Sequence, residues 1–224
     1  MTFSLVARCA DTGMFGVAVS SSSPAVAARC AYAEAGVGAA ASLTVTDPRL
    51  GPPTLRLLAD GATAAEAIAA VARTAPHPAF RQVLAVDRYG ASAIHSGANA
   101  LGLFREAQGE NVAAAGNILA DASVPQAMVD AFQSATGHLG ERLLIAMQAA
   151  LDAGGEEGPV RSAGLKLVRD TPWPIADLRV DWSEGCPIAD LRALWAIYAP
   201  QLEDYVTRAL DPTAAPSYGV PGDE

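Results

Sequence analysis

Residues 2–8 (TFSLVAR) and 15–20 (FGVAVS) decide the fold, because both stretches favour extended backbone and only a few residues separate them. The intervening residues 10–13 (ADTG) have the composition of a tight turn. A hairpin built on this turn pairs residues whose numbers add up to about 23, which places Thr2 opposite Ser21. The chain is therefore expected to begin with an antiparallel pair of strands, with a run of serines beside Thr2.

Outside the hairpin, strands and helices come in separate runs. Further strands are expected at 37–46, 82–87, 91–95, 111–115, 161–168 and 175–182. Helices are expected at 51–58, 63–73, 123–134, 139–153 and 188–210, and two of them open with capping-box patterns, TAAE at 63–66 and SVPQ at 123–126. Runs of strands followed by paired helices are typical of antiparallel sheets covered by helices. The predicted fold class is α+β, a four-layer αββα sandwich of two mainly antiparallel sheets.

The length of 224 residues suits one large domain, or one domain with an appendage. We expect residues 1–185 to form the sandwich domain and residues 186–224, a helix and an irregular tail, to be an appendage of it. An apolar stripe on that helix must be buried against the sandwich or against a second subunit. The stripe consists of Leu191, Leu194, Trp195, Tyr198 and Leu202. A homodimer is the expected assembly.

Composition excludes several classes of function. There are 15 Lys and Arg against 24 Asp and Glu, a net charge of −9 that disfavours nucleic acid as a partner. No apolar run approaches the roughly 20 residues of a membrane span. The three cysteines and three histidines are scattered, and no phosphate-binding glycine motif is present, so we expect no metal and no cofactor. Unpaired cysteines and the absence of a signal-like start predict a cytoplasmic protein.

Thr2 is the most informative candidate for catalysis. It directly follows Met1, and a small second residue generally permits removal of the initiator methionine. Thr2 would then combine a hydroxyl nucleophile with its own α-amine, whose pKa of about 8 suits a base. Many proteins begin Met-Thr for no catalytic reason, so a non-catalytic role is the alternative interpretation.

Other polar residues at strand ends are candidates for the same site. Ser20 and Ser21 are expected to hold the Thr2 amine, and with Ser22 they could bind substrate. Asn117 ends a strand and is expected to donate a hydrogen bond to an oxyanion. Three further substrate-binding candidates are Thr46, His95 and Arg161, the last of them for a substrate carboxylate. A turn residue, a polar loop, a surface histidine and a salt bridge are the ordinary structural alternatives.

Several blocks in order resemble the domain of unknown function 1028 family. They are the opening MTFSLVARCADTGMFGVAVSSSSPAV, DPRLGPPTLRLLADG at 47–61, FRQVLAVDRYG at 80–90, AAGNILA at 114–120, GGEEGPVRSAGLKLV at 154–168 and the ending APSYGVPGDE. The resemblance implies the αββα fold of the N-terminal-nucleophile (Ntn) hydrolases, which cleave amide bonds with an N-terminal Thr, Ser or Cys. Many members have Gln-Gly-Asn where this chain has AGN at 115–117, a departure that indicates a distinct substrate subgroup or a degraded site.

Two functions follow from these observations. The first is an Ntn amidohydrolase that cleaves a small amide or ureido-type C–N bond through Thr2, with a small molecule as substrate. The alternative is a non-catalytic small-molecule-binding or assembly protein on the same scaffold. Removal or retention of Met1 separates the two.

Overall fold

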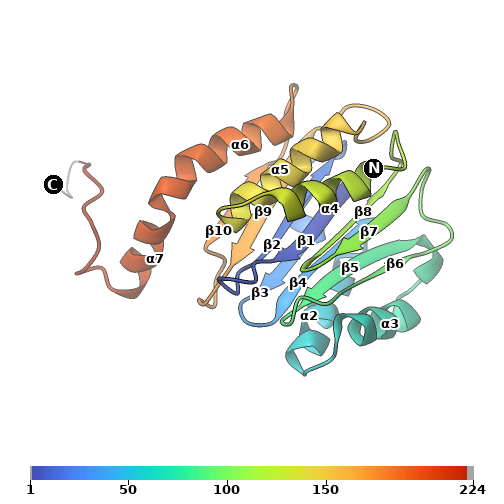
Figure 1. The fold of residues 1–224 in the computed structure, drawn as a ribbon, viewed down its shortest axis with the longest axis horizontal. Coiled ribbons are helices and arrows are strands. Elements are labelled where there is room, and N and C mark those ends of the chain that lie inside the picture. The colour runs from blue at the N-terminus through green and yellow to red at the C-terminus, as the bar shows by residue number, and fades with distance from the viewer. Residues whose placement is uncertain (1, 221–224) are drawn as a thin grey trace.

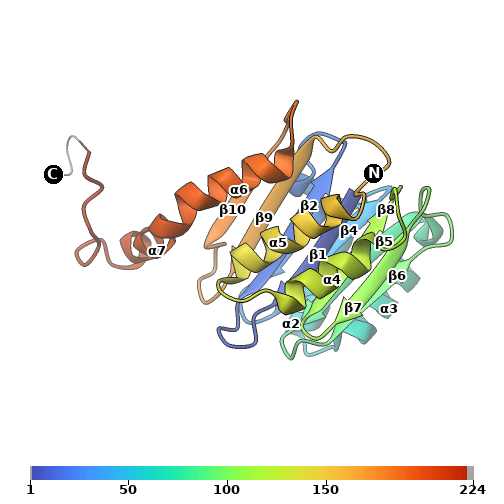
Figure 2. The same ribbon diagram turned by 45° about the horizontal axis from the view of Figure 1, so that its top comes forward.

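The computed structural model of the chain describes residues 2–220. Two sheets pack face to face between outer layers of helices (Figures 1 and 2). Within the described residues, the larger sheet has six strands in the order β10-β9-β2-β1-β8-β7 and the smaller has four in the order β3-β4-β5-β6. All of these strand pairs are antiparallel. The predicted α+β class with two antiparallel sheets is therefore confirmed.

The elements have the following bounds. The strands are β1 Thr2–Arg8, β2 Phe15–Ser21, β3 Ala31–Glu34, β4 Gly38–Thr44, β5 Arg81–Asp87, β6 Ser92–Ser96, β7 Arg105–Gly109, β8 Val112–Asn117, β9 Ser162–Val168 and β10 Ala176–Val180. The helices are α1 Ala27–Cys30, α2 Gly51–Ala59, α3 Ala64–Thr74, α4 Val124–Ser134, α5 Leu139–Asp152, α6 Pro187–Tyr198 and α7 Leu202–Leu210.

Alternation along β1 divides the core into layers. Phe3, Leu5 and Ala7 pack in the apolar cluster that includes residues of α4 and α5, whereas Val6 packs between the two sheets. A third apolar cluster lies between the smaller sheet and the helices α2 and α3. Because side chains alternate across a strand, Thr2 has the parity of Val6 and faces the space between the sheets.

The pairing of β1 with β2 has the register that the sequence predicts. Phe3 pairs with Ser20 and Arg8 pairs with Phe15, so paired numbers add up to 23. On its other side β1 pairs with β8, where Thr2 lies directly opposite Asn117. The central position of β1 in the larger sheet thus brings the starting residue of β1 between two neighbouring strands (Figure 1).

Four local expectations were wrong. The strands Ala31–Glu34 and Arg105–Gly109 were missed, since the first has four residues and the second is polar and mostly exposed. The helix expected at 188–210 is two helices joined by a 3-10 turn at Ala199–Gln201, because Pro200 cannot continue an α-helical hydrogen-bond ladder. Ser123 makes no side-chain cap to α4, whereas Thr63 forms the complete capping box with Glu66.

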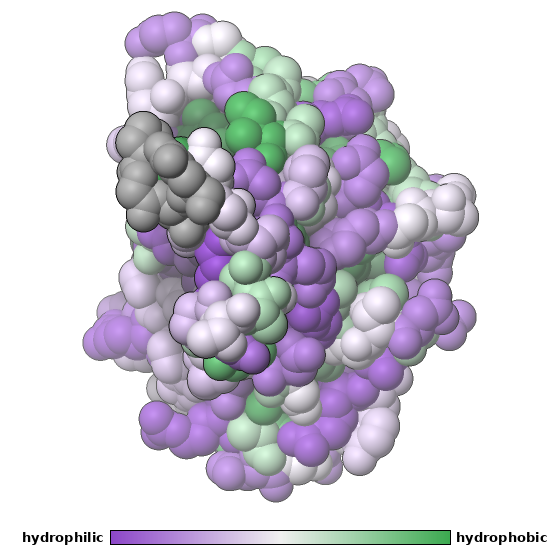
Figure 3. Space-filling view, turned by 90° about the vertical axis from the view of Figure 1, so that its left-hand side faces the viewer, coloured by the Kyte–Doolittle hydropathy of each residue, from purple (hydrophilic) through white to green (hydrophobic). Residues whose placement is uncertain are grey.

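The apolar stripe of the C-terminal helices is buried against the sandwich. Leu191, Trp195 and Leu202 belong to the core cluster under α5, and Leu194 and Tyr198 pack against it. α7 and the following segment extend away from the sheets (Figure 1), and that end of the surface mixes hydrophilic residues with small apolar patches (Figure 3). The stripe therefore does not call for a second subunit, and the homodimer stays a prediction. None of the helices in residues 2–220 has the length and apolar character to cross a membrane.

Candidate functional site

Thr2 lies at the edge of the intersheet space with a serine pair beside it. Its Oγ1 donates a hydrogen bond to Ser21 Oγ at 3.3 Å. Ser21 Oγ in turn lies 2.8 Å from Ser23 Oγ, and it accepts a hydrogen bond from the Ser23 backbone N–H at 3.1 Å. Thr2 is 4% exposed and Ser21 is fully buried. The predicted neighbours Thr2 and Ser21 are thus in contact through their hydroxyl groups.

Asn117 holds the main chain of Thr2 from the neighbouring strand. Its Nδ2 donates to the Thr2 carbonyl oxygen at 3.3 Å. Its Oδ1 is buried and has no hydrogen-bond partner among the described residues. The Asn117 amide therefore has one nitrogen hydrogen in use, and it also presents an unsatisfied acceptor.

Gln82 brings a second side-chain amide to the site from the smaller sheet. Its Nε2 donates to the Gly116 carbonyl at 3.3 Å and to Ser96 Oγ at 3.0 Å. Its Oε1 is likewise buried and without a partner among residues 2–220. Sequence reasoning missed Gln82, although it shares the inward parity of Leu84 and Val86 in a strand that was expected.

These two unsatisfied oxygens are energetically unusual. A buried acceptor left without a partner costs about 1–3 kcal/mol. Most buried polar groups in proteins are hydrogen-bonded, and each exception calls for an explanation such as strain, a functional role or a bound ion or water. Two such atoms on facing sheets beside Thr2 mark this end of the intersheet space as a candidate binding site.

Glu156 is a buried carboxyl group at the edge of the same region. It lies in the loop after α5, where it forms an isolated antiparallel β-bridge with Leu119. Both of its carboxylate oxygens lie 3.2 Å from the Ser22 backbone nitrogen. Glu156 is 4% exposed. Burial is the main cause that raises its pKa to about 7. Sequence reasoning did not single out Glu156, because an acidic residue in a glycine-rich loop gives no sign of burial.

Ser20 and His95, two of the predicted site residues, lie away from the space between the sheets into which Thr2 faces. Ser20 has the parity of Ala18 and faces the helix layer, where its Oγ donates to the Ser162 carbonyl at 3.0 Å. His95 points away from the intersheet space, and its Nε2 lies 3.1 Å from the Pro78 carbonyl. Successive side chains of a strand point to opposite faces of the sheet. Ser20 and His95 are each one position away from a residue that faces the space between the sheets.

Arg161 and Ser22 contribute to the structure in other ways. The Arg161 guanidinium forms a salt bridge with Glu184 at 3.0 Å and packs over the Trp182 ring, so the ordinary salt bridge accounts for it. Its backbone N–H donates to the Ser21 carbonyl at 2.8 Å. Ser22 contributes its backbone N–H to Glu156 rather than a hydroxyl to Thr2.

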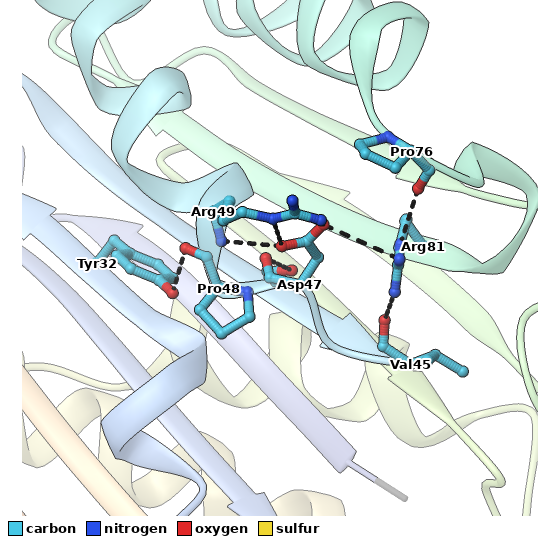
Figure 4. Close-up of polar contacts among 8 residues, drawn as sticks. Tyr32, Val45, Asp47, Pro48, Arg49, Pro76 and Arg81 are labelled. Atoms are coloured by element: carbon cyan, nitrogen blue, oxygen red, sulfur yellow. Dashed lines mark hydrogen bonds and ion pairs between the residues drawn. The ribbon is translucent and has the colours of Figure 1, made fainter.

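Thr46 lies just after the end of β4, next to Asp47, whose contacts with Arg49 and Arg81 are drawn in Figure 4. Thr46 Oγ1 contacts Cys30 Sγ at 3.7 Å. The buried Asp47 carboxylate accepts hydrogen bonds from the Arg49 side chain at 2.8 and 2.9 Å, and Arg81 approaches it at 3.9 Å. The hydrogen bonds from Arg49 hold the pKa of Asp47 below its ordinary value. This network anchors the connection from β4 to α2.

Metal ligands are not gathered anywhere in residues 2–220, where no cluster of three His, Cys, Asp or Glu side chains could hold an ion. Cys9, Cys30 and Cys186 are all free thiols. The side chains described around Thr2 carry hydroxyl, amide and carboxyl groups.

Comparisons with known proteins identify the family. None of the curated proteins matches the chain. A member of DUF1028 from Silicibacter pomeroyi is 28% identical over 88% of this chain and 89% of its own, with a TM-score of 0.83. Anbu (ancestral beta-subunit) from Yersinia bercovieri is 10% identical over 91% and 97% of the two chains, with a TM-score of 0.38. The Anbu (Gly-1) mutant from Hyphomicrobium sp. strain MC1 is 12% identical over 90% and 96%, with a TM-score of 0.40. TM-scores this low support no conclusion about the chain.

Residues 2–191 match the family of unknown function DUF1028, and the chain belongs to that family.

Proposed function

We propose that the chain is an N-terminal-nucleophile amidohydrolase whose nucleophile is Thr2, once Met1 has been removed. The observation that carries the proposal is the contact between Thr2 Oγ1 and Ser21 Oγ at the start of a central strand. An N-terminal nucleophile needs its hydroxyl held by neighbouring groups while its own amine acts as the base. The sandwich of two antiparallel sheets between helices supports the same conclusion, because it is the architecture expected of such hydrolases.

The reaction follows from these groups. Thr2 Oγ1 attacks the carbonyl carbon of a small amide, and the Thr2 α-amine takes the hydroxyl proton directly or through one water. The C–N bond then breaks, and the leaving nitrogen takes that proton. Water hydrolyses the resulting ester and regenerates the hydroxyl. The second Nδ2 hydrogen of Asn117 can donate to the oxyanion, since the first is held by the Thr2 carbonyl.

The test compares two substitutions of Thr2 in the processed protein. Intact mass first establishes whether Met1 has been removed. A panel of small amides and ureido compounds is then screened for ammonia or amine release. Thr2→Ser retains a hydroxyl and should retain measurable turnover, whereas Thr2→Ala should lose it.

A matched control is Ser4→Ala. Ser4 lies on the same face of β1, fully buried, with its hydroxyl bonded to the Ala18 carbonyl at 2.9 Å. Its loss should affect stability and leave the chemistry intact. Turnover by Thr2→Ala at the wild-type rate would reject the nucleophile.

The alternative is a non-catalytic protein that binds a small molecule at the same place. The unsatisfied oxygens of Asn117 and Gln82 favour it as much as they favour catalysis, because they need donors whether or not a bond is cleaved. A retained Met1 together with ligand binding that is insensitive to Thr2→Ala would support this alternative.

A further inference from the structure

Two side-chain amides on facing sheets each present one buried oxygen that has no hydrogen-bond partner within residues 2–220. The identity of these atoms follows from the contacts at the other end of each amide. Asn117 faces the Thr2 carbonyl, and Gln82 faces the Gly116 carbonyl. A carbonyl oxygen only accepts hydrogen bonds, so the end of each amide that touches it must be the nitrogen. Asn117 Oδ1 and Gln82 Oε1 are therefore the unsatisfied atoms, and both are acceptors.

The two amides are tied to adjacent points of the same main chain. Gln82 bonds the carbonyl of Gly116, the residue directly before Asn117, and Asn117 bonds the carbonyl of Thr2. Both side chains are fully buried and project into the space between the sheets. The pair of acceptors thus lies beside the residue proposed to act as nucleophile.

A surface groove lies on the far side of Ser96 from this pair, and neither Asn117 nor Gln82 lines it. This groove of about 290 Å³ is lined by Ser96, Phe104, Arg105 and Glu106. Ser96 separates the groove from Gln82, because its Oγ accepts from Gln82 Nε2 and donates to Glu106 at 2.6 Å. A small ligand in the groove is thus one side chain away from the unsatisfied oxygens.

We propose that the reacting group of the substrate is an unsubstituted amide, –C(=O)NH₂ of a carboxamide or ureido compound, whose N–H hydrogens are accepted by Asn117 Oδ1 and Gln82 Oε1. This inference rests on the proposed function and specifies its substrate class. Asn117 can pair with such a group edge to edge, because it has an acceptor oxygen and one remaining Nδ2 hydrogen. An N,N-dialkylated amide has no hydrogen to offer and would press methyl groups against buried acceptors.

The acceptors also suit the chemistry. Attack by Thr2 Oγ1 forms a C–O bond, the C–N bond breaks, and ammonia leaves with the proton carried by the Thr2 amine. The nitrogen gains positive character as it is protonated, so its N–H groups become stronger donors during departure. Interactions that strengthen on the way to the transition state raise the rate rather than only the affinity. Water then yields the acid, so the overall products are a carboxylic or carbamic acid and ammonia.

The experiment uses the processed, unaltered chain with butyramide, N-methylbutyramide and N,N-dimethylbutyramide, together with butylurea and its dimethyl counterpart. Each lost hydrogen bond should lower kcat/KM about tenfold, so the dimethyl probes should be about 100-fold poorer after correction for their reactivity with hydroxide. Gln82→Met removes one acceptor with little change of volume. It should reduce the preference for the primary amide over the dimethyl amide about tenfold. Ser4→Ala should leave the preference unchanged. Equal use of primary and dimethyl amides would overturn the inference.

Binding to the Thr2→Ala chain separates this inference from the proposed function. Ligand-observed NMR with butyramide and its dimethyl counterpart should detect preference for the primary amide, and Gln82→Met should weaken it. Preference without turnover by the unaltered chain supports the acceptor pair and rejects catalysis by Thr2. Thr2-dependent turnover with no preference retains the nucleophile and rejects the acceptor pair. The probe series on unaltered protein needs no variant, so misfolding of Gln82→Met would not block the test.

Discussion

Asn117 Nδ2 donates to the Thr2 carbonyl oxygen at 3.3 Å, between residues that are direct partners in the β1–β8 ladder. The side chain thereby fixes the main chain at the start of β1 and presents its Oδ1 to the space between the sheets. In the proposed mechanism, this one amide both positions the nucleophile Thr2 and contacts the substrate. A substitution of Asn117 should therefore lower kcat/KM by more than its effect on folding stability would predict.

Asn117→Ala should lower kcat/KM by roughly 10²–10³, the usual effect of losing one oxyanion donor. The same substitution removes the hydrogen bond to the Thr2 carbonyl and also an acceptor that has no partner among residues 2–220. These two effects on folding stability oppose each other, so the net loss should be small beside that rate effect. Amide turnover and urea denaturation on the same preparations measure both quantities. An unchanged rate in a folded Asn117→Ala variant would show that the amide takes no part in the reaction.

Helix capping offers a comparison between two sequence patterns that look alike. The Thr63 hydroxyl accepts from the Glu66 backbone N–H and the Glu66 carboxylate accepts from the Thr63 backbone N–H, while Ser123 makes no side-chain cap to α4. Thr63→Ala should reduce the free energy of unfolding by about 1 kcal/mol. Ser123→Ala, the matched control, should cost less, because its hydroxyl only contacts the exposed Asp121. Equal losses in chemical denaturation would contradict the difference between the caps.

The sequence predicted the parts of the site that local rules control. Hairpin arithmetic placed Thr2 beside Ser21 because a turn and a period of two determine which residues pair. The same period, applied one step further, would have excluded Ser20 and His95, which lie on the opposite faces of their strands. Gln82 comes from the other sheet, and its place beside Asn117 depends on how the two sheets pack. That packing is a long-range property that no local pattern encodes.

Gly164 should tolerate no side chain, because β9 packs closely against α1. A Cβ at this position would lie 2.3 Å from the Ala27 Cβ, well inside contact distance. Gly164→Ala should destabilise the fold by about 1–3 kcal/mol through overpacking. Gly13→Ala, which meets no atom within 4 Å but has a φ of +72°, provides a control in which only backbone strain acts. Thermal denaturation should show a partial rescue of Gly164→Ala by Ala27→Gly, and no rescue of Gly13→Ala by that change.

Glu156 should make the stability of the fold depend on pH. Its pKa rises from the ordinary 4.5 to about 7, chiefly through burial. Between these values the unfolded chain has released the proton while the folded chain retains it, so stability falls as the pH rises through this window. A shift of this size corresponds to about 3 kcal/mol at 1.36 kcal/mol per unit. The stabilising contribution of the protonated group is complete below about pH 4.5 and is lost above about pH 7.

Glu156→Gln should remove this dependence, because the amide keeps the shape and the acceptor for the Ser22 N–H without titrating. The variant should therefore gain stability relative to wild type as the pH is raised from 5 to 8, by up to about 3 kcal/mol. Urea denaturation across that range measures the difference. Glu157→Gln, an exposed neighbour in the same loop, should keep the wild-type slope. Parallel stability curves for wild type and Glu156→Gln would mean that the buried carboxyl does not hold its proton near neutral pH.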